Sequence, residues 1–258
     1  AVAARRSEAD TYFIGAVGTD EAGKTMSELL SQEEIDLTGV ATLENQATGQ
    51  AYIIVDDQGE NSIMIHAGAN NAFTPEQVRK SQAIIEKSDF IIAQFESAVE
   101  STIEAFKIAK KAGVKTILNP APALENVPEE LLKVTDMIIP NETETEILTG
   151  VTISDEASLQ AAASKLHALG IEVVIITIGS KGAFYALKDG KNGIVKAFKV
   201  NAVDTTAAGD TFIGAMSSLL AKDFSNLEEA IRYGNKASSL TVQRFGAQPS
   251  IPYKKELD

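Results

Sequence analysis

The stretch DTTAAGDTF, residues 204–212, places three small residues and an acid directly before an apolar segment. The apolar residues recur at helical spacing, which predicts a helix that begins within this stretch. The first amides of a helix have no partner inside it, and the helix dipole adds positive potential there. Because Ala207, Ala208 and Gly209 carry no bulky side chain, a phosphate can approach these amides closely. Asp210 follows at the edge of this anion site, where its carboxylate can accept a proton from an attacking hydroxyl.

Helix capping offers a simpler explanation of the same acid. An Asp in the first turn is common, and its charge stabilises a helix by about 0.3–1 kcal/mol without any ligand. Capping does not, however, require three small residues in a row. The residues alone leave both interpretations open.

A second stretch, GTDEAGKT at residues 18–25, matches the P-loop pattern and is a competing phosphate site. Asp20 and the glutamate after it would place two carboxylates in a loop that wraps phosphates, where they would repel the ligand. The segment YIIVDD at 52–57 resembles an aspartate-ended magnesium strand, but the chain turns back at once. We therefore interpret this stretch as a tight turn in which Gly18 and Gly23 allow close packing.

Short apolar runs alternate with longer amphipathic ones along the chain. Strands that are apolar over their whole length are typical of a parallel sheet covered on both faces. We expect strands at 12–17, 89–95, 114–118, 136–140 and 173–179. We expect helices near 21–31, 75–86, 99–112, 142–149, 155–169 and 227–243. The alternation predicts an α/β fold, a doubly wound and mostly parallel sheet with helices on both faces.

Two segments depart from this alternation and predict β-hairpins. The first is residues 51–66, with the polar turn DDQGEN, and the second is residues 183–200, with the turn residues DGKNG. The first lies early in the chain and is expected to project as a β-flap. Since no linker-like segment is evident, we expect residues 1–258 to form a single domain.

Polar or small residues follow four of the expected strands. They are Glu96, Asn119, Asn141 and Gly179. Ligands of open α/β sheets bind outside the carboxyl ends of the strands. We therefore expect these residues to converge on one crevice.

Composition narrows the classes of function. The chain has 258 residues, 44% of them hydrophobic, a formal net charge of −13 and a sequence pI of about 4.7. No basic face is evident for nucleic acid, and no apolar run is long enough to span a membrane. There is no cysteine and there are only two histidines, which disfavours a thiolate or histidine-rich metal site. We expect a cytoplasmic protein.

The motifs DTTAAGDTF, PNETE, TIGSKG and FGAQPSIP together resemble the pfkB family of carbohydrate kinases. The segments IHAGAN and NPAPA are similar to those members that phosphorylate D-ribose. The resemblance runs in order over the whole chain. It implies the transfer of phosphate from ATP to O5 of D-ribose, giving D-ribose 5-phosphate and ADP.

The resemblance also implies roles for particular residues. Asp210 would be the base that deprotonates the 5-hydroxyl, residues 207–209 would form the anion hole, and Glu96 would contact ribose. Together with Asn141, Glu144 would organise Mg²⁺ through water. The nucleotide would contact Asn141, Thr177, Gly179, Ser180, Lys181, Gly182, Gly209 and Asn235. An activating K⁺ would be held, largely through backbone carbonyls, by the loops of Asp204, Thr206, Thr241, Arg244, Gly246 and Ser250.

Two further expectations come from the resemblance. Family members carry a first strand with sugar-binding Asn and Asp residues and a GGKGAN-type motif, and we expect these to precede the sequence given. Residues 48–66 would form part of a β-lid, and the lids of two subunits would clasp in a homodimer.

The alternatives are a kinase for another sugar or nucleoside, or a non-catalytic sugar-binding protein of the same fold. The AAGD sequence argues against the latter, since a binder needs no base beside an anion hole.

Overall fold

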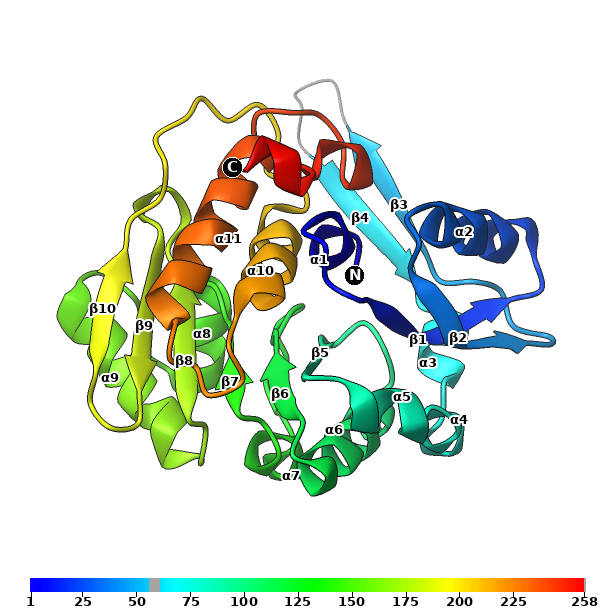
Figure 1. The fold of residues 1–258 in the computed structure, drawn as a ribbon, viewed down its shortest axis with the longest axis horizontal. Helices are drawn as coiled ribbons and strands as arrows, with labels where there is room; N and C mark the ends of the chain where they lie inside the picture. The colour runs from blue at the N-terminus through cyan, green and yellow to red at the C-terminus, as the bar shows by residue number, and fades with distance from the viewer. Residues whose placement is uncertain (56–60, 258) are drawn as a thin grey trace.

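The computed structural model describes the backbone of residues 1–55 and 61–257 and the side chains of residues 1–52 and 64–257 (Figure 1). Its main sheet has six strands in the order β10-β9-β8-β7-β6-β5. The strands are β5 (Phe90–Ala93), β6 (Lys115–Leu118), β7 (Met137–Ile138), β8 (Val173–Thr177), β9 (Ala183–Leu187) and β10 (Asn192–Val195). Strands β5 to β8 run parallel, whereas β9 pairs antiparallel with both β8 and β10.

The main sheet is covered on both faces, as the apolar strands predict. Alternate strand residues point to opposite faces, so that Leu118 and Val174 pack on one side and Ile117 and Val173 on the other. The first side is covered by α6 (Val99–Ala112), α7 (Glu129–Lys133) and α9 (Glu156–Ala168). The second is covered by α10 (Ala208–Leu219) and α11 (Leu227–Thr241). The doubly wound architecture predicted from the sequence is confirmed.

One expected strand lies outside the main sheet. The strand predicted at 12–17 is β1 (Tyr12–Gly18), which pairs in parallel with β2 (Asp36–Leu43) in a separate two-stranded sheet. The sequence of β2, DLTGVATL, mixes polar residues and a glycine with apolar ones, so its pattern did not predict a strand. This small sheet packs on α3 (Ala69–Ala72), α4 (Pro75–Lys80), α5 (Gln82–Lys87) and α6. The helix expected at 75–86 is interrupted at Ser81, between α4 and α5.

Both predicted hairpins are present. The first consists of β3 (Gln50–Val55) and β4 (Asn61–His66), paired antiparallel, and residues 56–60 of its predicted turn lie outside the described part of the chain. The second is β9 and β10, joined through Gly190 at φ +98°. Its second strand ends at Val195 rather than at residue 200.

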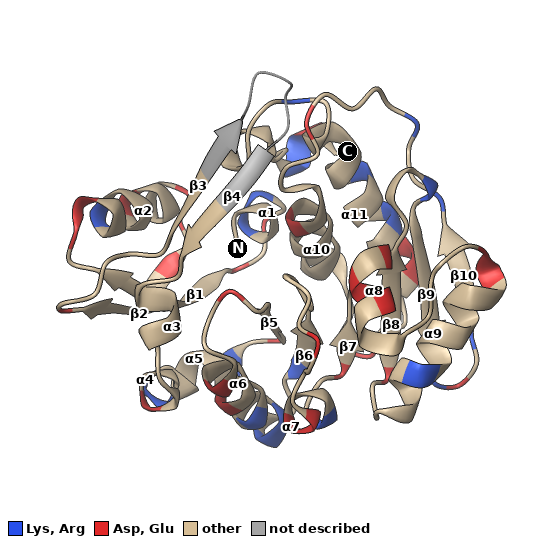
Figure 2. Ribbon diagram, turned by 180° about the vertical axis from the view of Figure 1, so that it is seen from behind, with Lys and Arg blue, Asp and Glu red and all other residues tan. Residues whose placement is uncertain are grey.

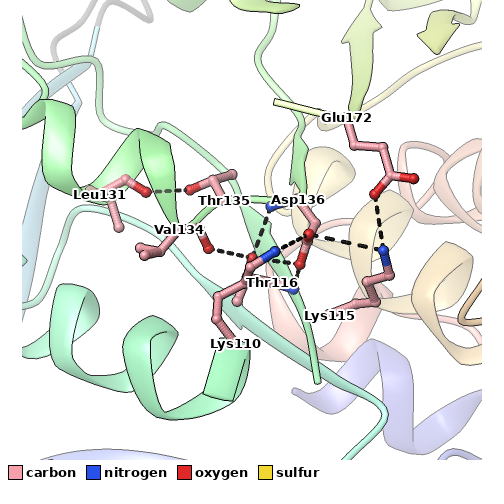
Figure 3. Close-up of polar contacts among 8 residues, drawn as sticks. All are labelled: Lys110, Lys115, Thr116, Leu131, Val134, Thr135, Asp136 and Glu172. Atoms are coloured by element: carbon pink, nitrogen blue, oxygen red, sulfur yellow. Dashed lines mark hydrogen bonds and ion pairs between the residues drawn. The ribbon is translucent and has the colours of Figure 1, made fainter. Parts of the chain in front are cut away.

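A buried carboxylate links the strands at their amino ends (Figure 3). Asp136, 5% exposed, accepts hydrogen bonds from the backbone N–H of Thr116 at 2.9 Å and from its hydroxyl at 3.0 Å. The ammonium of Lys110 lies 2.5 Å from the same carboxylate and that of Lys115 lies 3.9 Å away. The Asp136 carbonyl in turn accepts the backbone N–H of Val173 at 3.0 Å. This network ties β6, β7 and β8 together at the end of the sheet opposite the strand ends that carry the predicted site.

The remaining elements are α1 (Val2–Arg6), α2 (Glu21–Gln32), α8 (Glu142–Thr149), and three short 3-10 turns at Gly179–Lys181, Gln248–Ser250 and Lys254–Glu256. Basic residues of α6 and α7 lie among acidic ones (Figure 2), and Lys107 pairs with Glu130 across these helices. In the described part of the chain, every helix is too short or too polar to cross a bilayer.

Candidate active site

A cavity of about 340 Å³ opens at the carboxyl ends of β5 to β8, beside the start of α10. Six residues predicted to carry function line it: Glu96, Asn141, Glu144, Thr177, Gly209 and Asp210. Asn119 also lines it, so three of the four strand-end residues expected to converge do so. Gly179 does not line this cavity, and Thr177 of the same strand does. Parallel strands end at one edge of a sheet, and this topology gathers residues that are far apart in the sequence.

Helix α10 begins at Ala208, as its apolar spacing predicts. Ala207 precedes it in the left-handed region at φ 61° and ψ 10°, a conformation that costs a non-glycine residue on the order of 1–2 kcal/mol. Within the described chain, the N–H groups of Gly209 and Asp210 donate to no protein acceptor. The N–H of Ala208 donates to the Thr205 carbonyl at 3.2 Å and is therefore already engaged. The helix thus presents free amides and an exposed carboxylate, that of Asp210, at the cavity.

Asn141 and Glu144 form a reciprocal cap at the start of α8. The Glu144 carboxylate accepts the Asn141 backbone N–H at 2.9 Å and its side-chain amide at 2.9 Å, and the Asn141 oxygen accepts the Glu144 N–H at 2.8 Å. Glu144 is 7% exposed, and burial raises the pKa of its carboxyl above the ordinary value. The alternating glutamates of ETETE suggest a solvated helix start, but Glu144 is held inside, at the wall of the cavity.

The fit of a magnesium ion can be judged from these donors. No three His, Cys, Asp or Glu side chains gather into a metal-binding group within residues 1–52 and 64–257. Glu144 is the carboxylate at the cavity wall nearest the start of α8, and each of its oxygens already accepts one hydrogen bond. Mg²⁺ keeps several waters and needs few protein carboxylates when substrate phosphates complete its shell. The residues present therefore fit an ion held through water and phosphate oxygens.

Glu96 lies just beyond β5, and Gln94 holds it. The Gln94 amide donates to the Glu96 carboxylate at 2.5 Å, and the Gln94 oxygen accepts the Glu96 N–H at 2.5 Å. Gln94 also lines the cavity, although it is not among the residues predicted from the sequence. Its place two residues before Glu96, directly after the apolar strand β5, was the available signal.

The predicted nucleotide residues fall into two groups. Asn141 and Thr177 line the cavity and are joined as neighbours, since the Thr177 N–H donates to the Pro140 carbonyl at 3.0 Å. The segment Gly179–Lys181 forms a short turn that lies outside the cavity wall, and Ser180 and Lys181 are exposed. Gly182 ends this turn at φ 112°, and a Cβ there would lie 2.1 Å from the Val195 carbonyl oxygen, so the position requires glycine.

Asn235 has a structural partner in this chain. It is 7% exposed, and its amide donates to the carbonyls of Val195 at 3.0 Å and Lys196 at 3.3 Å. These bonds fix the end of β10 against α11. Its position beside adenine stays a prediction.

Most residues predicted to hold K⁺ lie on two loops that are bonded to each other, and Thr241 is the last residue of α11. The Asp204 carboxylate accepts the N–H of Thr206 and of Gly246, each at 2.9 Å. Hydrogen bonding from the Thr206 side chain, and then from these two N–H groups, lowers the pKa of Asp204. Ser250 is fully buried, and its carbonyl lies 3.5 Å from the Arg244 guanidinium. Thr241 directs its hydroxyl away from these loops, toward Thr211 at 3.1 Å. The remaining donors are carbonyl and carboxylate oxygens, which suit a hard cation.

The competing P-loop interpretation is wrong for this structure. Asp20 caps α2 by accepting the Gly23 N–H at 3.0 Å, and it also accepts the N–H and hydroxyl of Thr48 at 2.8 and 2.5 Å. A Cβ on Gly18 would lie 2.2 Å from the Gln46 carbonyl oxygen. The loop is filled by its own chain and has no room for a phosphate. The tight-turn interpretation, in which these glycines allow close packing, is confirmed.

An α/β fold with free helix amides, a carboxylate and an acidic cap at one sheet edge defines a candidate phosphotransferase. Comparison with known proteins gives the family: residues 1–254 match the pfkB family carbohydrate kinases, and the chain belongs to this family.

Three relatives bear on the particular reaction. A bifunctional ribokinase/ribose-5-phosphate isomerase A of Fructilactobacillus sanfranciscensis is 49% identical over all of this chain, which spans 47% of that protein, about half its length. A ribokinase of Staphylococcus aureus is 46% identical over all of this chain and 84% of its own length. A structure of Arabidopsis thaliana ribokinase complexed with ribose and ATP is 33% identical, with a TM-score of 0.94 over all of this chain and 83% of that one.

Proposed function

We propose that this chain phosphorylates D-ribose at O5 with ATP, giving D-ribose 5-phosphate and ADP. The observation that carries the proposal is the cavity in which the exposed Asp210 carboxylate, the free Gly209 amide and Glu96 meet. The relatives named ribokinase support the choice of sugar.

In the proposed mechanism, Asp210 accepts the proton of the 5-hydroxyl as O5 attacks the terminal phosphorus of ATP. Amides at the start of α10 donate to the oxygens that gain charge, and they do so without reorganising. Glu96, held by Gln94, accepts hydrogen bonds from sugar hydroxyls. A magnesium ion, when bound near Glu144, supplies neutralisation of phosphate charge. Glu144 itself holds the start of α8 through its cap with Asn141.

Potassium is proposed as an activator bound between the loops of Asp204 and Gly246. The Asp204 loop leads directly into residues 207–209, so fixing its carbonyls would fix the anion site. Replacing K⁺ by Na⁺ should slow turnover, and a rate indifferent to the cation would refute this role.

Residues 48–66, which include the β3–β4 hairpin, are proposed to form part of a β-lid, and this lid is proposed to clasp the lid of a second copy of the chain. Tyr52, Met64 and Ile65 support this, because they are 53%, 58% and 61% exposed on one hairpin. The protein is expected to sediment as a dimer, and the Met64→Asp variant is expected to sediment as a monomer.

A cytoplasmic location is also proposed, since the reaction consumes ATP.

The test of the proposed function is a coupled ADP-release assay with ATP, Mg²⁺ and K⁺. D-ribose, 2-deoxy-D-ribose, D-fructose and a nucleoside are compared at equal concentration. Turnover with D-ribose at a higher kcat/KM than with the other acceptors is expected. A preference for another acceptor would indicate that the chain is a kinase for that sugar or nucleoside. ATP binding without any turnover would indicate a non-catalytic protein.

A further inference from the structure

Ala207 is a left-handed residue held between two anchors, and both come from the C-terminal part of α11. Before it, the N–H groups of Val203 and Asp204 donate to the Val242 carbonyl at 2.7 and 3.2 Å. After it, the Ser238 hydroxyl donates to the Ala208 carbonyl at 3.0 Å. A strained conformation persists only where its surroundings determine it. These anchors therefore bear directly on the direction of the amides that follow.

The Ser238 bond is unlike those of neighbouring hydroxyls. Serines inside helices usually donate back to a carbonyl of their own helix, as Ser239 does to Lys236 at 2.7 Å and Ser217 to Ile213 at 2.7 Å. Ser238 instead reaches across to the first residue of α10. This crossing joins two helices that run side by side (Figure 1).

Helices α10 and α11 pack closely, which restricts movement of the Ser238 hydroxyl relative to the Ala208 carbonyl. One turn before Ser238, Gly234 faces α10 so closely that a Cβ there would lie 2.8 Å from the Phe212 carbonyl oxygen. Asn235, on the same helix, is fixed to the end of β10. Helix α11 is therefore anchored to the main sheet and can serve as a rigid support for the start of α10.

We propose that Ser238 is a positioning residue, which holds Ala207 in its left-handed conformation and so aims the anion-binding amides at the transferring phosphate. The proposal rests on the proposed function for its kinetic consequence, but its structural content does not depend on the substrate. Since the developing charge of the transition state uses these amides most, the loss should fall on kcat more than on KM.

The test compares Ser238→Ala with the matched control Ser239→Ala, which removes a neighbouring buried hydroxyl bonded within its own helix. With D-ribose and ATP, kcat of Ser238→Ala should fall by about tenfold with little change in either KM, the scale of one hydrogen bond. The control should keep kcat within about twofold, since its lost bond lies outside the site. Ser238→Thr retains the hydroxyl and should restore most of the rate.

A second readout is independent of turnover. Crystal structures should show Ala207 at positive φ in the control and displaced in Ser238→Ala. Glycine adopts positive φ without strain, so adding Ala207→Gly to Ser238→Ala should recover most of kcat. An unchanged φ at Ala207 in Ser238→Ala, or no recovery in the double variant, would overturn the proposal. If no variant shows ribose-dependent turnover, the proposed function fails, while the φ of Ala207 still decides the role of Ser238.

Discussion

Replacing Asp210 by Asn separates chemistry from folding more sharply than any other single change in this chain. Asparagine has almost the same shape as aspartate but cannot take up the proton of an attacking hydroxyl. General-base catalysis contributes about 10²–10⁴-fold, which corresponds to about 3–5 kcal/mol of transition-state stabilisation. We therefore expect kcat to fall by two to four orders of magnitude, while the KM for ATP stays close to that of the unaltered protein.

The effect on folding should be small, for a reason visible in the structure. Asp210 is exposed, and its carboxylate makes no hydrogen bond within the described chain. Its removal loses the interaction with the helix dipole, about 0.3–1 kcal/mol, and an electrostatic attraction to the ammonium of Ala1. For a chain of this size that shifts Tm by at most about 4 °C. The protein remains folded at 25 °C, so lost turnover cannot be ascribed to unfolding.

The matched control is Glu100→Gln in the first turn of α6. Neither α6 nor α10 has a side-chain N-cap, and Glu100 is an exposed first-turn acid as Asp210 is. The control should show the same small change in Tm and unaltered kcat. Rates are measured by coupled ADP release and Tm by calorimetry. If Asp210→Asn kept kcat within about threefold of the unaltered protein, the assignment of the base would be wrong.

Three other changes test the remaining structure. Lys24→Ala should leave kcat within about twofold, because this 67% exposed side chain pairs, within the described residues, with Glu21 alone at 3.5 Å. Loss of all turnover in the same assay would instead support the P-loop interpretation. Asp136→Ala should lower Tm by about 5–10 °C, as expected for about 2–3 kcal/mol from a broken buried network, yet spare kcat at 25 °C. Equal loss of kcat would show that the amino ends of the strands take part in catalysis. Glu33→Gln should lower Tm at pH 7, because the hydrogen bond from Arg6 lowers the pKa of Glu33. The Arg6–Glu33 pair stabilises the fold fully at pH values above 4.5, the ordinary pKa of a Glu carboxyl, and this stabilisation is lost as the pH falls through the lowered pKa of Glu33. The Tm values of the variant and the unaltered protein should therefore converge in acid. A difference in Tm that stays constant with pH would contradict this.

The active-site edge was predictable because it depends on patterns that a sequence carries directly. Apolar runs predict buried strands, and the polar residue after each run predicts a position at the carboxyl edge. Glu96, Asn119 and Asn141 were located in this way and do line one cavity. The start of α10 was predictable from the helical spacing of its apolar residues, and the small residues there predicted that its first amides would be open to a ligand.

Other features depend on contacts that no local pattern encodes. Strand β2 contains polar residues because it belongs to a small two-stranded sheet, so its pattern did not predict a strand. The left-handed conformation of Ala207 cannot be read from alanine, which disfavours it, and becomes intelligible only beside Ser238 and Val242. The saturated carboxylate of Asp136 requires partners from β6 and α6, which are distant from it in the sequence.

The two ends of the main sheet use the same chemical group in opposite ways. At the amino ends, Asp136 accepts a backbone N–H and a hydroxyl and lies beside two ammonium groups. A carboxylate so occupied stabilises strand pairing, but its lone pairs are not available to a substrate hydroxyl. At the carboxyl ends, the Asp210 carboxylate accepts no hydrogen bond from the described chain and faces a cavity. Proton transfer to a base requires free lone pairs on the carboxylate, and stabilisation of the charge on a phosphoryl group requires free amides. The difference in hydrogen bonding, rather than in residue type, therefore separates the structural acid from the acid proposed to react.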